Sequence, residues 1–393
     1  MNFAVFSALP GSGRWSAIAD ILCLCGIAAV VVAGIANGRL ALRGQRPSGL
    51  AAVVAHGPLA LLVAALATMF CSIWQRGIEV HHFPSQTMSE VLNMFTTALL
   101  ISMTVLHFAL GLARRGPGWA ILDDVLVGLV LGGVYGTHAY IRTLSTAQRD
   151  LPPALQSYWF PPHLSSLIFS YATMAIAALI ALVFFVTRFW TGVFGGGVPK
   201  KKMAFSFVGL ALIPFAQVVT LPVLAVSGLV FLVLWRLKRL PGPARLAALE
   251  KELDEVSFRA FAVGIPFLTA GVWMGAFWAQ EAWANYWGWD SKENTALITW
   301  LVYVLYIHLR MLGGYRGSKA MAVLVGGALS VFMTFQIFGY LPDSQKSLHR
   351  YTDDNVVPSE GQQGSAPSTQ ARAEAPSEER TASEMLPEGR KGG

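Results

Sequence analysis

A run of aromatic and charged residues between two apolar segments is the part of the sequence best suited to chemistry. It spans residues 278–293 and reads WAQEAWANYWGWDSKE. In membrane proteins, Trp and Tyr gather at the headgroup level, where an apolar ring and a polar N–H or O–H are both satisfied. Such a belt accounts for one or two rings, whereas this run holds Trp278, Trp283, Tyr286, Trp287 and Trp289. A patch of this density predicts a binding surface for a flat, hydrophobic, conjugated ligand.

Three histidines are candidate ligands for such a molecule. His163 stands at the start of an apolar segment and His349 follows the end of another, and we expect both on the same side of the membrane as the aromatic run. Two neutral imidazoles beside an aromatic surface can take both axial positions of a haem iron, although two surface histidines also share one face by chance. His308 lies inside an apolar segment, where a hydrogen bond between helices is as common a role as metal ligation. No role is assigned to the other histidines, which are His56, His81, His82, His107 and His138.

The composition predicts the elements that position these residues. Of 393 residues, 54% are hydrophobic and only 13% are charged, whereas soluble proteins have about 25% charged residues. Apolar segments long enough to cross a bilayer recur along the chain, so we expect an all-α polytopic membrane protein with about eight transmembrane helices. The expected spans are residues 17–36, 51–73, 90–112, 119–140, 163–187, 261–280, 294–312 and 320–340.

The cations of the loops predict the orientation. The net charge is +7, but the basic residues lie in short connections between spans, so they indicate topology and not a nucleic-acid partner. By the positive-inside rule the basic connections face the cytoplasm, and the aromatic run, His163 and His349 face outward. The apolar run 206–235 has basic residues on both flanks and contains Pro214 and Pro222. We therefore expect it to form a hairpin or re-entrant segment with an even number of crossings.

Two further segments complete the expected organisation. In residues 242–259, leucines and a valine recur at helical spacing among charges, which predicts an amphipathic cytoplasmic helix. Residues 352–393 are rich in Glu, Ser, Pro, Gly and Gln, which predicts a disordered, outward-facing tail without chemistry of its own. Residues 1–351 then form one polytopic membrane domain.

The segment 254–310 resembles a known family, the CcsA (ResC) proteins of cytochrome c synthesis. The tryptophan-rich WWD motif of that family has the general form W-G-x-x-W-x-W-D-x-K-E, followed by A-L-I-T-W and a membrane histidine. The matching residues are Trp283, Trp287, Trp289, Asp290, Lys292 and Glu293, then 296–300 and His308. Three departures bear on the geometry of the loop: Ala284 replaces the Gly, Ser291 replaces a common Pro, and Asn294-Thr295 replaces a usual Thr-Trp.

Further stretches agree with this resemblance, which covers roughly residues 50–351. Residues 151–163, LPPALQSYWFPPH, resemble the outer loop that brings the first external haem-ligand histidine, which implies that role for His163. Residues 333–351 resemble the C-terminal segment with the second external histidine, which implies that role for His349. Residues 76–92 match a family segment more weakly. His308 matches the membrane histidine that pairs, in the family, with a histidine of the partner CcsB (ResB) to hold haem inside the bilayer.

The resemblance implies a function in System II cytochrome c synthesis. Haem b made in the cytoplasm would enter the membrane at His308 and move outward to the WWD motif, where His163 and His349 ligate the iron. An apocytochrome c then offers its C-x-x-C-H segment, whose thiols add to the haem vinyl groups. The implied partners are a CcsB/ResB-type membrane protein, the apocytochrome and a thiol-reducing thioredoxin-like protein. The chain would be a subunit of a cytochrome c haem lyase in the bacterial inner membrane, with the WWD loop on the periplasmic side.

The charged members of the motif have two interpretations. Asp290, Lys292 and Glu293 could orient the haem propionates or could orient the motif itself. For Lys292, a direct contact with a propionate and a Lys–Glu pair that fixes the loop remain equally open. No residue is assigned as a general acid or base.

Two other classes of protein are alternatives. One is a System I-like WWD protein that exports haem or loads it onto a chaperone without performing the ligation; the sequence W-D-x-K-E and the length of the chain favour System II. The other is an unrelated polytopic transporter with a strong aromatic belt. That alternative leaves the order of the motif and the two external histidines unexplained.

Overall fold

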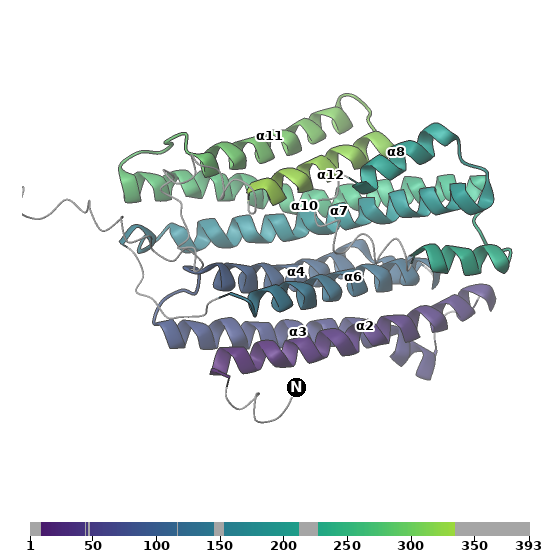
Figure 1. The fold of residues 1–393 in the computed structure, drawn as a ribbon, viewed down its shortest axis with the longest axis horizontal. Coiled ribbons are helices and arrows are strands. Elements are labelled where there is room, and N and C mark those ends of the chain that lie inside the picture. The colour runs from purple at the N-terminus through teal and green to yellow at the C-terminus, as the bar shows by residue number, and fades with distance from the viewer. Residues whose placement is uncertain are drawn as a thin grey trace, which may run out of the picture. The chain divides into compact units, whose positions relative to one another are not determined.

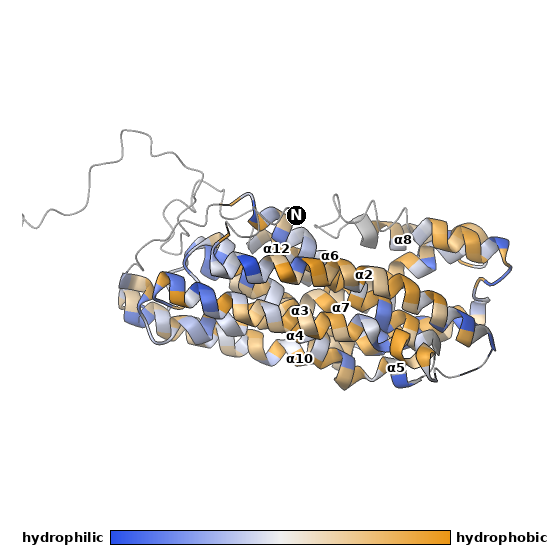
Figure 2. Ribbon diagram, turned by 90° about the horizontal axis from the view of Figure 1, so that it is seen from below, coloured by the Kyte–Doolittle hydropathy of each residue, from blue (hydrophilic) through white to orange (hydrophobic). Residues whose placement is uncertain are grey.

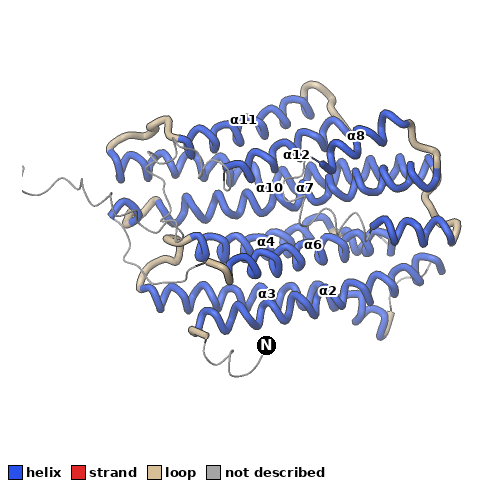
Figure 3. Tube along the Cα trace, in the orientation of Figure 1, coloured by secondary structure: helices blue, strands red, loops and turns tan. Residues whose placement is uncertain are grey.

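The computed structural model describes residues 9–43, 45, 48–115, 117–144, 153–211 and 227–334. The chain divides into two compact units, residues 1–352 and 353–393, and every described residue belongs to the first. The described residues form helices joined by loops, and none of them is in a strand (Figures 1 and 3). The predicted all-α class is confirmed. The predicted tail and His349 lie outside the described residues.

Six helices in the described part of the chain are long and apolar enough to cross a membrane. They are α2 Gly11–Arg43, α3 Leu50–Val80, α4 Met88–Leu110, α6 Pro117–Ile141, α7 Phe160–Gly195 and α10 Pro243–Trp283. Five of them contain the whole of one expected span, and α4 ends two residues before the expected span 90–112 does. Figure 2 shows hydrophobic residues along the helices and hydrophilic residues mainly toward their ends. The chain is therefore an integral membrane protein.

The last two expected spans correspond to α11 Ser291–Met311 and α12 Ser318–Phe332. α11 has 21 residues, and it carries Glu293 in its first turn and Arg310 in its last. α12 has 15 residues and is shorter than a full span. Neither is among the helices that combine the necessary length and hydropathy. The expected total of eight crossings therefore stays a prediction.

Two short helices cover the two ends of the run 206–235 that is predicted to be a hairpin: α8 Lys200–Ala211 and the helix Ser227–Arg236. Both pack on the C-terminal part of α7. On α8, the rings of Phe207 and Phe189 are 6.1 Å apart, and on the other helix the rings of Trp235 and Phe194 are also 6.1 Å apart. The chain thus returns to the end of α7 from which it departed, as an even number of crossings requires. Residues 212–226 lie outside the described part, so the number of crossings remains a prediction.

The segment predicted as a separate amphipathic helix is instead the first part of α10, which runs unbroken from Pro243 to Trp283. Its apolar face packs in the protein core, where Leu253 and Val256 are buried. Its acidic residues accept from buried arginines: Arg188 of α7 lies 2.5 Å from Glu250, and Arg310 of α11 lies 3.0 Å from Asp254. These ion pairs hold the polar turns inside the bundle. Helix formation therefore continues without a break into the following span.

Helix packing forms two groups that share α4. α2 packs on α3 and α6, while α7 packs on α10 and α12, and α12 also packs on α11. α4 contacts α3, α6 and α7 (Figure 1). The longest contact joins α7 and α10, because Gly264 and Gly271 of α10 face side chains of α7: a Cβ on Gly271 would lie 2.6 Å from Leu167 Cδ2. This close approach brings the outer loop before α7 beside the end of α10.

Candidate functional site

The aromatic run divides into the last turns of α10, a seven-residue loop from Ala284 to Asp290, and the first turn of α11. α10 ends at Ala284, which is in the left-handed region with φ of 57° and donates its N–H to Gln280 O over 3.0 Å. Glycine is the favoured residue at this position of a helix end. The resemblance had placed a glycine here, and the structure supplies the physical reason.

Asp290 and Glu293 form a capping box at the start of α11. The Asp290 carboxylate accepts the N–H of Glu293 over 2.8 Å. The Glu293 carboxylate accepts the N–H of Asp290 over 3.3 Å and that of Gly288 over 2.7 Å. Three backbone donors at the helix start are thereby satisfied. These contacts orient the motif itself, which is one of the two interpretations of the acidic residues.

Asn294 stabilises the strained part of the loop. In the sequence, this residue was noted only as a departure from the family motif. Trp289 has a φ of 57°, which is uncommon for a residue with a large side chain. The Asn294 amide donates to the Trp289 carbonyl over 2.9 Å. Lys292 is half-buried in the first turn of α11, and its carbonyl accepts from the Thr295 hydroxyl over 3.0 Å. The loop is therefore shaped by hydrogen bonds from residues that follow it.

Two rings of the loop are presented to the outside of the protein. Tyr286 is 57% exposed and Trp289 is 69% exposed. Trp287 lies edge-on to Trp289 with ring centroids 6.1 Å apart. Rings held in this way offer both an apolar face and a polar tip to a bound molecule. They form the accessible part of the predicted aromatic surface.

Trp278 and Trp283 belong to the core side of the predicted surface. Trp278 is only 3% exposed, and its indole N–H donates to Ala154 O over 2.9 Å. Its ring packs against Trp283 at 4.8 Å and against Phe160 at 5.0 Å. Trp278 thus supports the site from the protein core, without being accessible to a bound molecule. The predicted platform is not one continuous sheet of exposed rings, because Trp278 is buried in the core and the half-buried Trp283 packs against it.

The loop before α7 lies directly beside the end of α10. Ser157 donates to the Glu281 carboxylate over 2.5 Å, and the rings of Trp159 and Phe277 are 5.0 Å apart. These contacts join segments more than a hundred residues apart in the sequence. They place the start of α7, and with it His163, next to the aromatic run.

His163 is half-buried between α7 and α10. Its Nδ1 bonds to the Gly271 carbonyl over 2.7 Å, and its ring stacks on Trp278 with centroids 5.6 Å apart and planes at 24°. A carbonyl oxygen only accepts, so Nδ1 carries the proton and Nε2 carries the lone pair. This is the tautomer that a metal-binding imidazole requires, with the orientation set by the bond on the other nitrogen.

The structure does not bring His308 to this site. His308 lies near the end of α11, about 26 Å from the start of that helix at 1.5 Å per residue. Its side chain is exposed, and Nδ1 bonds to the Val304 carbonyl over 2.8 Å. The exposed residues Leu301 and Leu305 share its face. His308 therefore faces outward from the bundle, as a residue that meets a partner or lipid would, and Nε2 again carries the lone pair.

The chain is similar to known proteins over most of its length. The family described as "Cytochrome C assembly protein" matches residues 55–342. The "Cytochrome c biogenesis protein CcsA" of Synechocystis sp. is 32% identical over 311 residues, which are 75% of this chain and 88% of the relative. That of Gloeothece citriformis is 31% identical and covers 70% of this chain and 81% of the relative. That of Guillardia theta is 29% identical and covers 74% and 83% respectively.

Proposed function

The chain belongs to the cytochrome c assembly protein family, and on this basis we propose that it binds haem beside the WWD loop and presents it for covalent attachment to apocytochrome c. The observation that carries the proposal is the position of His163. Its Nδ1 is held by Gly271 and its ring is stacked on Trp278, so the lone pair of Nε2 has a defined direction next to the aromatic run. A role in cytochrome c biogenesis follows from family membership; the haem site is our proposal.

In the proposed site, exposed and buried rings have different tasks. Tyr286, Trp287 and Trp289 contact the macrocycle of haem b, which is flat and apolar. Trp278 and Trp283 hold the ligand histidine and the helix end in place. His163 supplies one axial nitrogen and His349 the other, and bis-histidine ligation suits a haem that is held without binding oxygen. His349 lies outside the described residues, so its role rests on the resemblance alone.

The attachment reaction needs no redox change in the thioether step. Each thiol of the apocytochrome C-x-x-C-H segment adds across one vinyl double bond: the sulfur bonds to one carbon and the thiol hydrogen goes to the other. The chain contributes orientation, since rings and an axial ligand fix where the vinyl groups stand. The histidine of the apocytochrome then replaces one external axial ligand.

The proposal includes a second haem position and a partner. His308 ligates haem inside the bilayer together with a histidine of a CcsB/ResB-type protein, for which its outward-facing side chain is suited. The thiols of the apocytochrome are kept reduced by a thioredoxin-like protein. The WWD loop faces the periplasm of a bacterial inner membrane, as the distribution of basic residues predicts.

The test is the haem spectrum of the protein purified with its partner. His163→Ala, His349→Ala and His308→Ala are compared with the wild type and with His81→Ala, an exposed outer-side histidine outside the site. We expect each ligand variant to weaken or shift the Soret band and added imidazole to restore it, while His81→Ala keeps the wild-type spectrum. Unchanged spectra in all ligand variants, or a wild type without haem, would overturn the proposal.

A further inference from the structure

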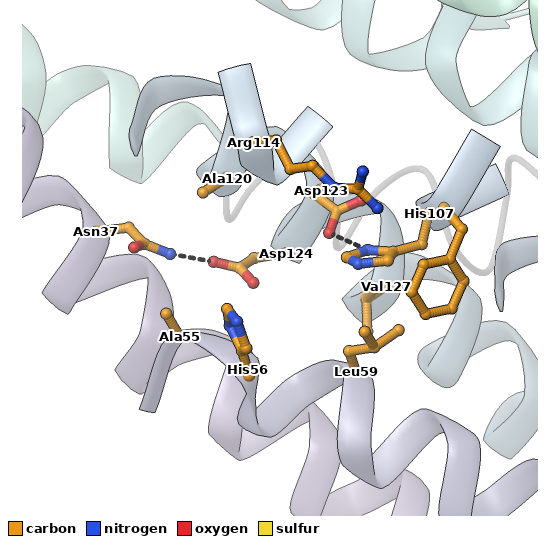
Figure 4. Close-up of a pocket in the computed structure, with 11 residues that line it drawn as sticks. Asn37, Ala55, His56, Leu59, His107, Arg114, Ala120, Asp123, Asp124 and Val127 are labelled. Carbon is orange, nitrogen blue, oxygen red and sulfur yellow. Dashed lines mark hydrogen bonds and ion pairs between the residues drawn. The ribbon is translucent and has the colours of Figure 1, made fainter. Parts of the chain in front are cut away.

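A pocket of about 320 Å³ with several polar residues in its lining lies between α2, α3, α4 and α6, away from the aromatic run. Figure 4 shows Asp124 bonded to Asn37 and Asp123 bonded to His107, and His56 also lines the pocket. These helix ends are the ones joined by basic loops, so the pocket is expected toward the cytoplasm. None of these residues has a part in the proposed haem site.

Two carboxylates line the pocket and are nearly inaccessible to solvent. Asp123 is 4% exposed and Asp124 is 5% exposed. His107 Nδ1 lies 2.6 Å from Asp123 Oδ2, and the Asn37 amide donates to Asp124 Oδ2 over 2.8 Å. Each carboxylate therefore has one neighbour that fixes its orientation. Carboxylates buried inside a membrane protein are costly and mark functional sites.

Two acceptor oxygens of this group have no hydrogen-bond partner among the residues that the structure describes. They are Asp123 Oδ1 and Asn37 Oδ1, and both are buried. The carboxylate of Asp124 accepts hydrogen bonds, so the amide nitrogen of Asn37 must face it and the amide oxygen must face elsewhere. Buried oxygens without a donor cost about 1–3 kcal/mol each. Their presence on the walls of one pocket calls for an occupant that donates hydrogen bonds or carries positive charge.

The charges that face the pocket favour a cation over an anion. His56 and Arg114 also line the pocket, but both are exposed to water, which screens their charge. His107 contacts only one of the two carboxylates, so the buried end carries negative charge when Asp124 is ionised. A proton on Asp124 would remove that charge but would leave Asn37 Oδ1 and Asp123 Oδ1 without donors. A cation with its water shell would balance the negative charge, and its water molecules would donate hydrogen bonds to the two oxygens.

We propose that this pocket binds a hydrated monovalent alkali cation. Its volume is enough for roughly ten waters at about 30 Å³ each, so an ion can keep part of its hydration shell. Carboxylate and amide oxygens are the ligands of hard cations. Within the described residues no three His, Cys, Asp or Glu side chains are arranged to hold a metal ion directly. A monovalent ion in the pocket would therefore contact the protein largely through water molecules.

The other end of the same helices provides a matched control. There Asp20 of α2 lies 2.6 Å from His138 Nδ1 of α6 and also accepts from Arg142. The second ring nitrogen of His138 is 3.2 Å from the Thr96 hydroxyl. This Asp–His pair joins the same group of helices, and both of its ends have partners. Asp20→Asn thus makes the same chemical change as Asp123→Asn at a place that does not line the pocket.

The experiment measures binding of sodium and rubidium radiotracers to the full chain in nanodiscs, with rubidium standing for potassium. The expected result is saturable binding of one ion per chain. Asp123→Asn and Asn37→Leu are each expected to weaken it at least tenfold, while Asp20→Asn keeps the wild-type affinity. The melting temperature of the wild type is expected to rise with the bound ion and not with N-methylglucamine at equal ionic strength.

Any of three results would overturn the proposal. The first is the absence of saturable binding of both ions to the wild type. The second is binding that survives in folded Asp123→Asn and Asn37→Leu. The third is a melting temperature that depends on pH but not on the alkali cation, which would assign the pocket to a proton. The wild-type measurement decides the question even where a variant fails to fold. Comparison of the two tracers tells which ion the site prefers.

Discussion

Gly275 of α10 lies directly against the imidazole of His163. A Cβ at position 275 would be 2.6 Å from His163 Cε1 and 2.8 Å from Nδ1. Four residues earlier, the Gly271 carbonyl accepts from the same ring over 2.7 Å. Two glycines one helical turn apart thus position the imidazole of His163: Gly275 leaves space for the ring, and Gly271 supplies the carbonyl that accepts its hydrogen bond.

We predict that Gly275→Ala displaces His163 and reduces haem retention by about 10- to 100-fold, because groups that orient a ligand histidine have effects of this size. The matched control is Gly264→Ala on the same helix, where the added Cβ would meet Met174 Cγ of α7 at 3.2 Å, far from the histidine. Soret absorbance per mole of purified protein measures both. Equal losses of haem in the two variants would show that helix packing in general, and not the position of His163, is responsible.

We predict that Ala284→Gly stabilises the protein by about 1 kcal/mol, because Ala284 has a φ of 57° and glycine adopts this conformation without the steric cost of a Cβ. The control, Ala282→Gly, lies within α10 and is expected to destabilise by about the same amount or more. Thermal unfolding in detergent measures both changes. Shifts of the same sign would contradict the assignment of Ala284 as the helix terminator.

Asp290 allows its two interpretations to be separated. As a helix cap, Asp290→Asn should keep haem retention within about twofold of the wild type, since asparagine caps as well as aspartate does. Asp290→Ala should lower stability by about 1 kcal/mol and weaken haem binding through disorder of the loop. If Asp290→Asn loses haem as severely as Asp290→Ala, the negative charge itself is needed and the capping interpretation is wrong.

The inward and outward tryptophans should respond differently to truncation. Trp278→Ala removes a buried ring and is predicted to destabilise the protein by about 3–5 kcal/mol. Trp289→Ala removes a ring that is 69% exposed and is predicted to change stability by less than about 0.5 kcal/mol while reducing haem retention. Unfolding and Soret absorbance are measured on the same preparations. A haem signal unchanged by Trp289→Ala would remove this ring from the binding surface.

The buried ion pair of Arg310 and Asp254 is predicted to anchor the end of α11. Arg310 is 2% exposed and its guanidinium lies 3.0 Å from Asp254. Asp254 also accepts from the Gly317 N–H over 2.9 Å. Arg310→Leu alone should cost about 3–5 kcal/mol, because it leaves a buried carboxylate uncompensated. Adding Asp254→Ala should recover part of this loss in unfolding measurements, and strictly additive losses would contradict direct coupling.

Some elements of the structure were predictable from the sequence and others were not. Hydropathy located the six long helices, since a run of apolar residues of sufficient length is a local property. Residues 242–259 were predicted as an amphipathic cytoplasmic helix apart from the span 261–280, because the charges at 250–255 suggested a surface helix, whereas α10 runs through both segments. The arginines that neutralise them, Arg188 and Arg310, are distant in sequence, so no local pattern announces that these turns are buried.

The sequence alone determined the class of membrane protein, the aromatic loop between two helices and the family to which the chain belongs. The N-terminal cap of α11 can also be predicted from the sequence, because Asp290 and Glu293 stand three residues apart in one helical turn. Only the tertiary structure decided which tryptophans face inward and that His163 rests on Gly271, Gly275 and Trp278. The reason is that helix rotation and the pairing of distant side chains depend on packing between helices, and residues 163 and 271 meet only after α7 and α10 have assembled.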